Sequence, residues 1–253
     1  MSTVISMANQ KGGVGKTTTT GALAAGLHNK GFKVLAIDLD PQGNLTFSLG
    51  GDNELNATIY DVLREEVKIQ HAIQHLPTTD LIAANILLSG IELEFTNTGR
   101  EFLLREALTP IIPLYDYILI DTPPALGILT VNAFTTSDYI VVPMLSDIFS
   151  LQGIAQLHDT VDRVRKYCNK DIRFAGILLN RSNPRTLLST EIRGTAKMIS
   201  DTLDIPLFNT SIRSSVTVSE AQSLQSSLYE YAPTNIAVKD YSSFVNELLK
   251  RGI

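Results

Sequence analysis

The sequence predicts an α/β fold in which a mostly parallel, twisted sheet carries helices on both faces. Short apolar runs rich in β-branched residues recur along the chain, as buried parallel strands require. Helix-like runs separate them, which favours right-handed βα units. The 253 residues are 44% hydrophobic and 19% charged, which suits a large globular core. The expected strands are 4–7, 33–38, 81–84, 117–121, 139–143 and 174–180.

A glycine-rich stretch between the first apolar run and a helix-like run over 19–29 organises the prediction. Gly12, Gly13 and Gly15 lack a Cβ, so the backbone can curve closely around a polyphosphate. The positive end of the following helix dipole favours an anion there. Lys16 can reach the β- and γ-phosphates, and the Thr17 hydroxyl can bind Mg²⁺. Strand, glycine loop and helix in this order predict the P-loop NTPase fold.

The loop departs from the strict phosphate-loop pattern at one position. That pattern requires Gly where Gln10 stands, and a second lysine, Lys11, follows. The run K-G-G-V-G-K-T resembles the deviant Walker A motif of the ParA/MinD family of P-loop ATPases. The resemblance implies ATP and Mg²⁺ as cofactors, and it implies that Lys11 crosses a dimer interface to the partner's phosphates. The implied nucleotide-binding residues are Lys11, Gly12, Gly13, Val14, Gly15, Lys16, Thr17 and Thr18.

Two expected strands end in carboxylates, where α/β folds bind ligands. Strand 33–38 leads into D-L-D-P-Q-G-N, which resembles the ParA pattern D-x-D-P-Q-G-N and implies that Asp40 orients or activates the attacking water. The alternative is that Asp40 only caps a turn before Pro41. Strand 117–121 delivers Asp121, which would hold Mg²⁺ together with Thr17, and the following D-T-P-P resembles the second switch of the family. Lys11, Lys16, Asp40 and Asp121 are therefore the expected catalytic residues.

Asn180 ends the last of the expected strands. An Asn amide can both donate to and accept from an adenine edge. In the ParA/MinD family an Asn at this place contacts the adenine, so the resemblance implies that role. The alternative is a turn-forming Asn before Arg181.

The charge distribution leaves room for a nucleic-acid surface. The formal net charge is −5, which argues against a wholly basic binder. From residue 163 to 197, however, nine Arg or Lys stand against two acidic residues, a local balance of +7. Charge alone favours the alternative that this segment is an ordinary solvated face. The family resemblance favours DNA-backbone binding, and the residues it implies are Arg185, Arg193, Lys197 and Arg213.

Other features argue against competing classes. The aromatic stripe of the last helix, 237–250, could lie on a membrane as in MinD, but a core role is simpler. His71 and His75 stand four residues apart, yet nothing completes a metal set, so they are expected on a surface helix. The one cysteine, Cys168, favours a reducing cytoplasm and excludes the paired cluster cysteines of nitrogenase-type reductases. The first strand starts too early to leave room for a signal peptide.

The motifs occur in family order along nearly the whole chain, which predicts one domain over residues 1–253. The resemblance is to the ParA/Soj branch, and it implies an ATP-dependent homodimer that binds DNA non-specifically. Such a protein partitions a plasmid or chromosome with a ParB-like adaptor that carries a basic N-terminal segment. The expected location is cytoplasmic and associated with the nucleoid. Two alternatives remain, which are positioning of a protein cargo on the nucleoid and a MinD-like membrane-cycling regulator.

Overall fold

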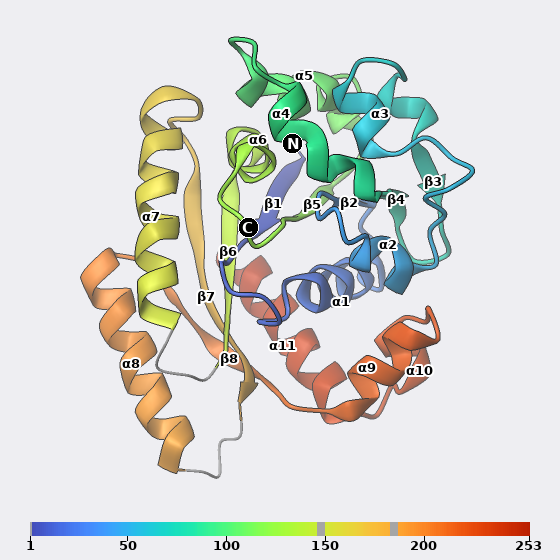
Figure 1. Ribbon diagram of the computed structural model, residues 1–253. Coiled ribbons are helices and arrows are strands. Elements are labelled where there is room, and N and C mark those ends of the chain that lie inside the picture. Colours follow the sequence, from blue (N-terminus) through green and yellow to red (C-terminus); the bar gives the residue numbers. More distant parts are fainter. Residues whose placement is uncertain (1, 146–149, 183–186) are drawn as a thin grey trace.

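The computed structural model describes residues 2–145, 150–182 and 187–253. Their strands form one eight-stranded sheet of order β3-β4-β2-β5-β1-β6-β7-β8 (Figure 1). All neighbouring strands are parallel except β3, which runs antiparallel to β4. The strands are β1 Thr3–Met7, β2 Val34–Asp38, β3 Ile73–His75, β4 Asp80–Ile82, β5 Tyr117–Asp121, β6 Tyr139–Leu145, β7 Arg173–Ser182 and β8 Leu207–Arg213. The predicted fold class is confirmed.

The register of the central strands brings three chain segments to the same sheet edge. Met7 at the end of β1 pairs with Asp121 at the end of β5. Asp38 at the end of β2 pairs with the same residue from the other side. Because parallel strands end together, the loops after β1, β2 and β5 converge at this edge.

Helices cover both faces of the sheet, as Figure 1 shows. One apolar core lies between the sheet and α3, α5, α6, α7 and α8. A second core on the opposite face is formed with α1, α9, α10 and α11. The helices are α1 Lys16–His28, α2 Asn44–Leu49, α3 Ile59–Leu63, α4 Ile91–Glu94, α5 Leu103–Leu108, α6 Ile128–Thr136, α7 Ser150–Tyr167, α8 Leu187–Leu203, α9 Val216–Ser223, α10 Leu228–Tyr231 and α11 Ile236–Lys250.

The strand β8 was not predicted from the sequence. In its seven residues only Phe208 and Ile212 are buried, so it lacks the continuous apolar run of the inner strands. It lies at the sheet edge beside β7, where one side has no strand neighbour among the described residues. An edge strand can carry polar side chains, which hides it from a search for apolar runs.

The helix expected for the two histidines is wrong. His71 ends a short 3₁₀ turn, whereas His75 ends β3, where its Nδ1 atom lies 2.7 Å from Asp80 Oδ1. The i, i+4 spacing therefore does not place them on one helical face. The described residues contain no group of three or more His, Cys, Asp or Glu side chains that could hold a metal ion.

The last helix, α11, packs into the core. This confirms the prediction that its aromatic stripe is part of the core. Tyr241, Phe244, Val245 and Leu248 are buried against the sheet and α1. The rings of Phe244 and Phe208 meet edge to face with centroids 4.9 Å apart. None of the helices in the described residues combines the length and apolar character that crossing a bilayer requires.

Candidate nucleotide site

The glycine loop after β1 adopts backbone conformations that side chains disfavour. Gly13 and Gly15 have φ values of +73° and +91°. A Cβ on Gly15 would lie 2.7 Å from Asn180 Nδ2, so this position needs glycine for space as well as for conformation. Gly15 is also the residue that caps the start of α1. The loop therefore delivers the first turn of α1 directly to the edge where β2 and β5 end.

Asn9 fixes the start of the loop, a role that the sequence analysis did not assign. The side chain is 3% exposed, and its Nδ2 atom donates to the Pro143 carbonyl on β6 at 2.7 Å. Its Oδ1 atom accepts from the Lys11 backbone N–H at 3.0 Å. An Asn two residues before the loop lysine therefore ties the loop to the neighbouring strand. This pairing with Pro143 depends on the order of the strands, which the sequence alone does not reveal.

Lys16 is buried beneath the loop. Its side-chain Nζ atom donates to the Asn9 carbonyl at 3.1 Å and to the Lys11 carbonyl at 3.5 Å. Burial lowers the pKa of Lys16 below its ordinary value, while Asp121 and Asp40 oppose that shift. The ammonium is thus held by backbone carbonyls, which cannot neutralise its charge. An anion bound at the loop would supply the negative charge that neutralises the ammonium.

The two predicted metal ligands lie together. The Thr17 hydroxyl donates to Asp121 Oδ2 at 2.6 Å. The neighbouring Thr20 hydroxyl lies 3.4 Å from the other carboxylate oxygen. A hydroxyl on the first turn of α1 and a carboxylate at the end of β5 form the oxygen donor pair that P-loop enzymes present to Mg²⁺.

Two carboxylates at this sheet edge, Asp38 and Asp121, have pKa values above the ordinary range. Burial, followed by the charge of Asp38, raises the pKa of Asp121 well above its ordinary range, and the Thr17 hydroxyl and Lys16 oppose this. Burial also raises the pKa of Asp38 to about 6, against hydrogen bonds from Thr46 and the Asp40 backbone. A cation beside Asp121 would stabilise the charged form of this carboxylate, which burial and the neighbouring negative charge disfavour.

Asp40 lies in the loop between β2 and α2 and is 9% exposed. Its Oδ1 atom accepts from the Gln42 N–H at 3.0 Å, and its carbonyl accepts from the Gly43 N–H at 2.9 Å. The turn-capping alternative therefore describes part of what Asp40 does. The same carboxylate acts electrostatically on Lys16 and Asp121, so the residue also belongs to the charged site.

Asn180, at the carboxyl end of β7, packs against the glycine loop. Its Nδ2 atom donates to the Val14 carbonyl at 2.9 Å and to the Thr19 hydroxyl at 3.2 Å. Its Oδ1 atom is buried and has no hydrogen-bond partner within residues 2–145, 150–182 and 187–253. An orphaned buried acceptor is costly, so its presence points to a ligand that donates.

A cavity lies beside Asn180 and the start of α1. Its walls come from the glycine loop, from the end of β8 and from α9, and they include Val14, Gly15, Thr18, Asn180, Arg181, Ile212, Ser214, Ser215, Val218 and Gln222. The side-chain amide nitrogen Nε2 of Gln222, on α9, donates to the Thr18 hydroxyl at 3.3 Å. The sequence analysis missed Gln222 because the approach of α9 to α1 depends on the tertiary fold.

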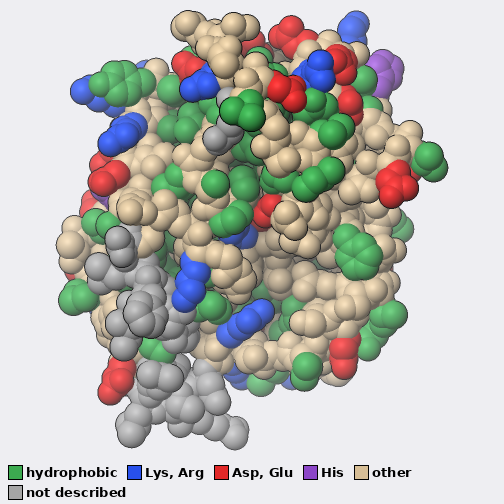
Figure 2. Space-filling view, in the orientation of Figure 1, with side chains coloured by type: hydrophobic (Ala, Val, Ile, Leu, Met, Phe, Trp, Pro, Cys, Tyr) green, Lys and Arg blue, Asp and Glu red, His purple; other side chains and the backbone are tan. Residues whose placement is uncertain are grey.

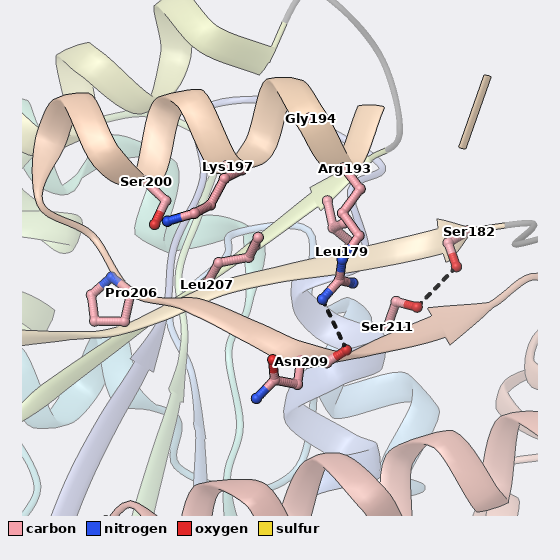
Figure 3. A pocket seen from close by; sticks show the side chains of 10 residues that line it. All are labelled: Leu179, Ser182, Arg193, Gly194, Lys197, Ser200, Pro206, Leu207, Asn209 and Ser211. Atoms are coloured by element: carbon pink, nitrogen blue, oxygen red, sulfur yellow. Dashed lines mark hydrogen bonds between the residues drawn. The ribbon is translucent and has the colours of Figure 1, made fainter. Parts of the chain in front are cut away.

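Two of the residues predicted to bind DNA lie on α8. Arg193 and Lys197 are exposed and line a cavity of about 780 Å³ between α8 and the strands β7 and β8 (Figure 3). Arg193 reaches toward β8, where its Nη2 atom donates to the Asn209 carbonyl at 3.4 Å. Lys197 forms an ion pair with Asp201 one turn along the helix.

The other two predicted DNA-binding residues differ from this pair. Arg213 at the end of β8 makes a two-pronged ion pair with Asp240 on α11, in which Nε donates to Oδ2 at 2.8 Å and Nη2 to Oδ1. Its charge is therefore compensated within the fold. Arg185 lies outside the described residues.

Figure 2 shows one face of the molecule with its charged side chains. On the described part of this face, Lys and Arg side chains are dispersed rather than gathered into a single patch. Acidic side chains lie among them along the upper edge of the view. Any polyanion surface on this face of one chain is accordingly modest in charge density.

Known proteins resemble this chain over most or all of its length. A family model described as "AAA domain" matches residues 2–174. The sporulation initiation inhibitor protein Soj of Bacillus subtilis is 37% identical over 257 residues, covering 100% of both chains. The chromosome partitioning protein ParA of Caulobacter vibrioides (strain NA1000 / CB15N) is 38% identical, covering 98% of this chain and 94% of its own.

A solved structure supports the fold over the full length. Cobyrinic acid a,c-diamide synthase from Mycobacterium smegmatis, with bound ATP analogue and magnesium, superposes with a TM-score of 0.86. It is 31% identical, covering 100% of this chain and 96% of its own. The full-length matches to Soj and ParA, together with the glycine loop and its two lysines, show that the chain belongs to the ParA/Soj family of partition ATPases.

Proposed function

We propose that this protein is a Mg²⁺-dependent ATPase that dimerises with ATP, binds DNA non-specifically and partitions a plasmid or chromosome with a ParB-like adaptor. The proposal treats residues 1–253 as one domain that acts in the cytoplasm on the nucleoid. It rests on the family, on the convergence of charged groups at one sheet edge, and on the orphaned acceptor beside the glycine loop.

The observation that carries the proposal is the meeting of Lys16, Thr17 and Asp121 under the glycine loop. Thr17 and Asp121 are in hydrogen-bond contact at 2.6 Å, and Lys16 is buried with only backbone carbonyls among its hydrogen-bond partners in the described residues. A triphosphate would neutralise Lys16 and accept from the loop N–H groups. The arrangement therefore suits a triphosphate bound together with Mg²⁺.

The residues present fit ATP and Mg²⁺. Thr17 and Asp121 would hold the metal, which supplies charge neutralisation on the phosphate oxygens. Asn180 Oδ1, which is buried and has no partner in the part of the chain that the structure describes, would accept from the amino group of adenine. Asp40 would accept a hydrogen bond from the attacking water and so orient it.

We assign Lys11 to the dimer. Its backbone N–H is fixed by Asn9 at 3.0 Å, which holds this part of the loop in place. Lys11 is half-buried, whereas the following Gly12 and Gly13 are exposed, so the loop lies at the surface. If a second subunit faces this loop, Lys11 would contact the phosphates of the nucleotide that the second subunit binds. Hydrolysis would then remove the charge that joins the two subunits.

The DNA surface is assigned to α8. Arg193 and Lys197 are exposed on it, and phosphate contacts need only charge and reach. Because a dimer carries this helix twice, ATP-dependent dimerisation would strengthen DNA binding without any new contact within one chain. The same surface would serve a protein cargo carried on the nucleoid, and that alternative differs only in the adaptor.

Phosphate release from Mg·ATP tests the enzymatic part. We expect the wild type to hydrolyse ATP in the presence of DNA, and we expect EDTA to abolish the release. Asp40→Ala should bind ATP with little change but release almost no phosphate. Absence of hydrolysis by the wild type, with and without DNA, would contradict the proposal.

A further inference from the structure

Asp38, at the end of β2, is wholly buried and makes three hydrogen bonds. Its Oδ2 atom accepts from both the backbone N–H and the hydroxyl of Thr46, each at 2.8 Å. Its Oδ1 atom accepts from the Asp40 backbone N–H at 3.1 Å. One carboxylate therefore holds the first part of the loop at Asp40 and the first turn of α2 at Thr46.

Thr46 extends this connection to another strand. The side chain is 1% exposed, and its hydroxyl, which donates to Asp38, also accepts from the Ala84 backbone N–H at 3.0 Å. Ala84 follows closely after β4, the sheet neighbour of β2. A hydroxyl that donates and accepts at once fixes both its own rotamer and the position of α2 relative to the sheet.

The loop between these anchors carries Asp40. Gly43 has a φ of +64°, and its N–H is bonded to the Asp40 carbonyl, so the chain turns tightly between Asp40 and α2. A shift of α2 would therefore move the Asp40 side chain as well. A displacement of about 1 Å in a group that orients a nucleophile can cost about 100-fold in rate.

We propose that Asp38 and Thr46 are positioning residues for ATP hydrolysis, which hold the Asp40 loop between β2 and β4 through the Asp38–Thr46–Ala84 hydrogen-bond chain. The inference rests on the proposed function, because it concerns the hydrolytic role of Asp40. Neither side chain lines the cavity beside the glycine loop. Their loss should therefore slow the chemical step and leave nucleotide binding intact.

The deciding variant is Thr46→Val, which keeps the branched shape and removes the hydroxyl. We expect kcat for phosphate release to fall about 10-fold to 100-fold, with the Kd for ATP within about twofold of wild type. Thr46→Ser retains the hydroxyl and should restore most of kcat. A simple loss of packing would give the opposite order, because serine loses a methyl group and valine does not.

Ser48→Ala is the matched control on the same helix. Ser48 is also buried, but among the described residues its hydroxyl bonds only locally, to the Leu45 carbonyl at 3.0 Å. This variant should keep the wild-type kcat. If Thr46→Val does not fold, Asp38→Asn supplies the second test, with the same loss of kcat at unchanged ATP affinity.

The outcomes separate this inference from the proposed function. A Thr46→Val or Asp38→Asn protein with wild-type kcat, beside an active wild type, would overturn the inference alone. Equal losses of kcat and ATP affinity would also overturn it, because they indicate a damaged binding site. A wild type that binds but never hydrolyses ATP would remove the proposed function and this inference together.

Discussion

At the scale of single residues, Asn180 carries the clearest evidence for a bound nucleotide base. Its amide nitrogen is bonded to Val14 and Thr19, which fixes the orientation of the side chain and leaves Oδ1 as a buried acceptor. Adenine presents an amino donor where guanine presents a carbonyl acceptor. The residue therefore predicts a preference for ATP over GTP.

Replacing Asn180 by Leu should lower ATP affinity about 10-fold and narrow the preference over GTP, because one hydrogen bond to the base is lost. Isothermal titration with each nucleotide measures both effects. Asn246→Leu, at an exposed position on α11, is the control and should change neither affinity. Equal losses for ATP and GTP would show that Asn180 does not read the base.

Asp38 predicts a specific pH dependence of stability. Its pKa of about 6 in the folded protein lies above the ordinary value of 3.8, so the folded state holds the proton more tightly than the unfolded state. The stability that this provides is complete below about pH 3.8 and is lost as the pH rises through about 6. Linkage gives a loss of about 3 kcal/mol.

Urea unfolding of the metal-free protein between pH 4 and pH 7 checks this value. The unfolding free energy of the wild type should fall by about 2 kcal/mol across this range relative to Asp38→Asn, which cannot titrate, because part of the full loss already occurs below pH 4. The comparison cancels the titrating groups that do not interact with Asp38. Parallel curves for the two proteins would mean that Asp38 is ionised in the fold over the whole range.

Lys11 predicts a separation of binding from assembly. Lys11→Ala should retain ATP binding, because Lys16 lies in the loop of the same chain and would contact the phosphates. It should lose ATP-dependent dimerisation, because the charge expected to reach the partner's phosphates is gone. Analytical ultracentrifugation with ATP measures this, and a Lys11→Ala dimer as stable as the wild type would contradict the assigned role.

At the scale of elements, α8 and β8 separate two kinds of arginine. Arg193 is exposed on α8, whereas the Arg213 guanidinium is bound to the 7% exposed Asp240 of α11. Arg193 lies within the basic segment 163–197 and Arg213 follows it. The sequence suggested the same role for both, and the fold shows that their surroundings differ. The first is available to a DNA phosphate, and the second holds β8 against α11.

The double variant Arg193→Ala/Lys197→Ala should weaken DNA binding at all sequences. If each side chain contacts one phosphate, the slope of log affinity against log salt should fall by about 1.8. Fluorescence anisotropy at several salt concentrations measures the slope, with Lys30→Ala, an exposed position after α1, as the control. An unchanged slope would place the DNA surface elsewhere.

Arg213→Ala should act on stability. It leaves the Asp240 carboxylate without the two guanidinium bonds, which should cost about 2 kcal/mol of unfolding free energy. Thermal unfolding measures the loss, and Lys239→Ala, a neighbouring exposed position on α11, is the control. A fully stable Arg213→Ala protein would show that the ion pair contributes little and would return Arg213 to the set of DNA contacts.

At the scale of the whole molecule, the sequence predicted the inner strands and the loops that follow them. Continuous apolar runs ending in Asp38, Asp121 and Asn180 identified β2, β5 and β7, and parallel strands bring such ends together. The hydrogen-bonded pairs that support the site were not predictable from the sequence. Asn9 with Pro143, Thr46 with Ala84 and Gln222 with Thr18 are pairs that depend on strand order and helix packing.

The central claim is that ATP controls DNA binding through assembly of two chains. Binding of a non-specific DNA duplex at low salt, with ATP, ADP or no nucleotide, tests it most directly. The account predicts that the protein binds DNA with ATP but not with ADP or without nucleotide. It also predicts that added salt and the Lys11→Ala substitution each weaken this DNA binding. Binding that is equal in all three nucleotide states, or absent in all three while ATP hydrolysis is intact, would contradict it.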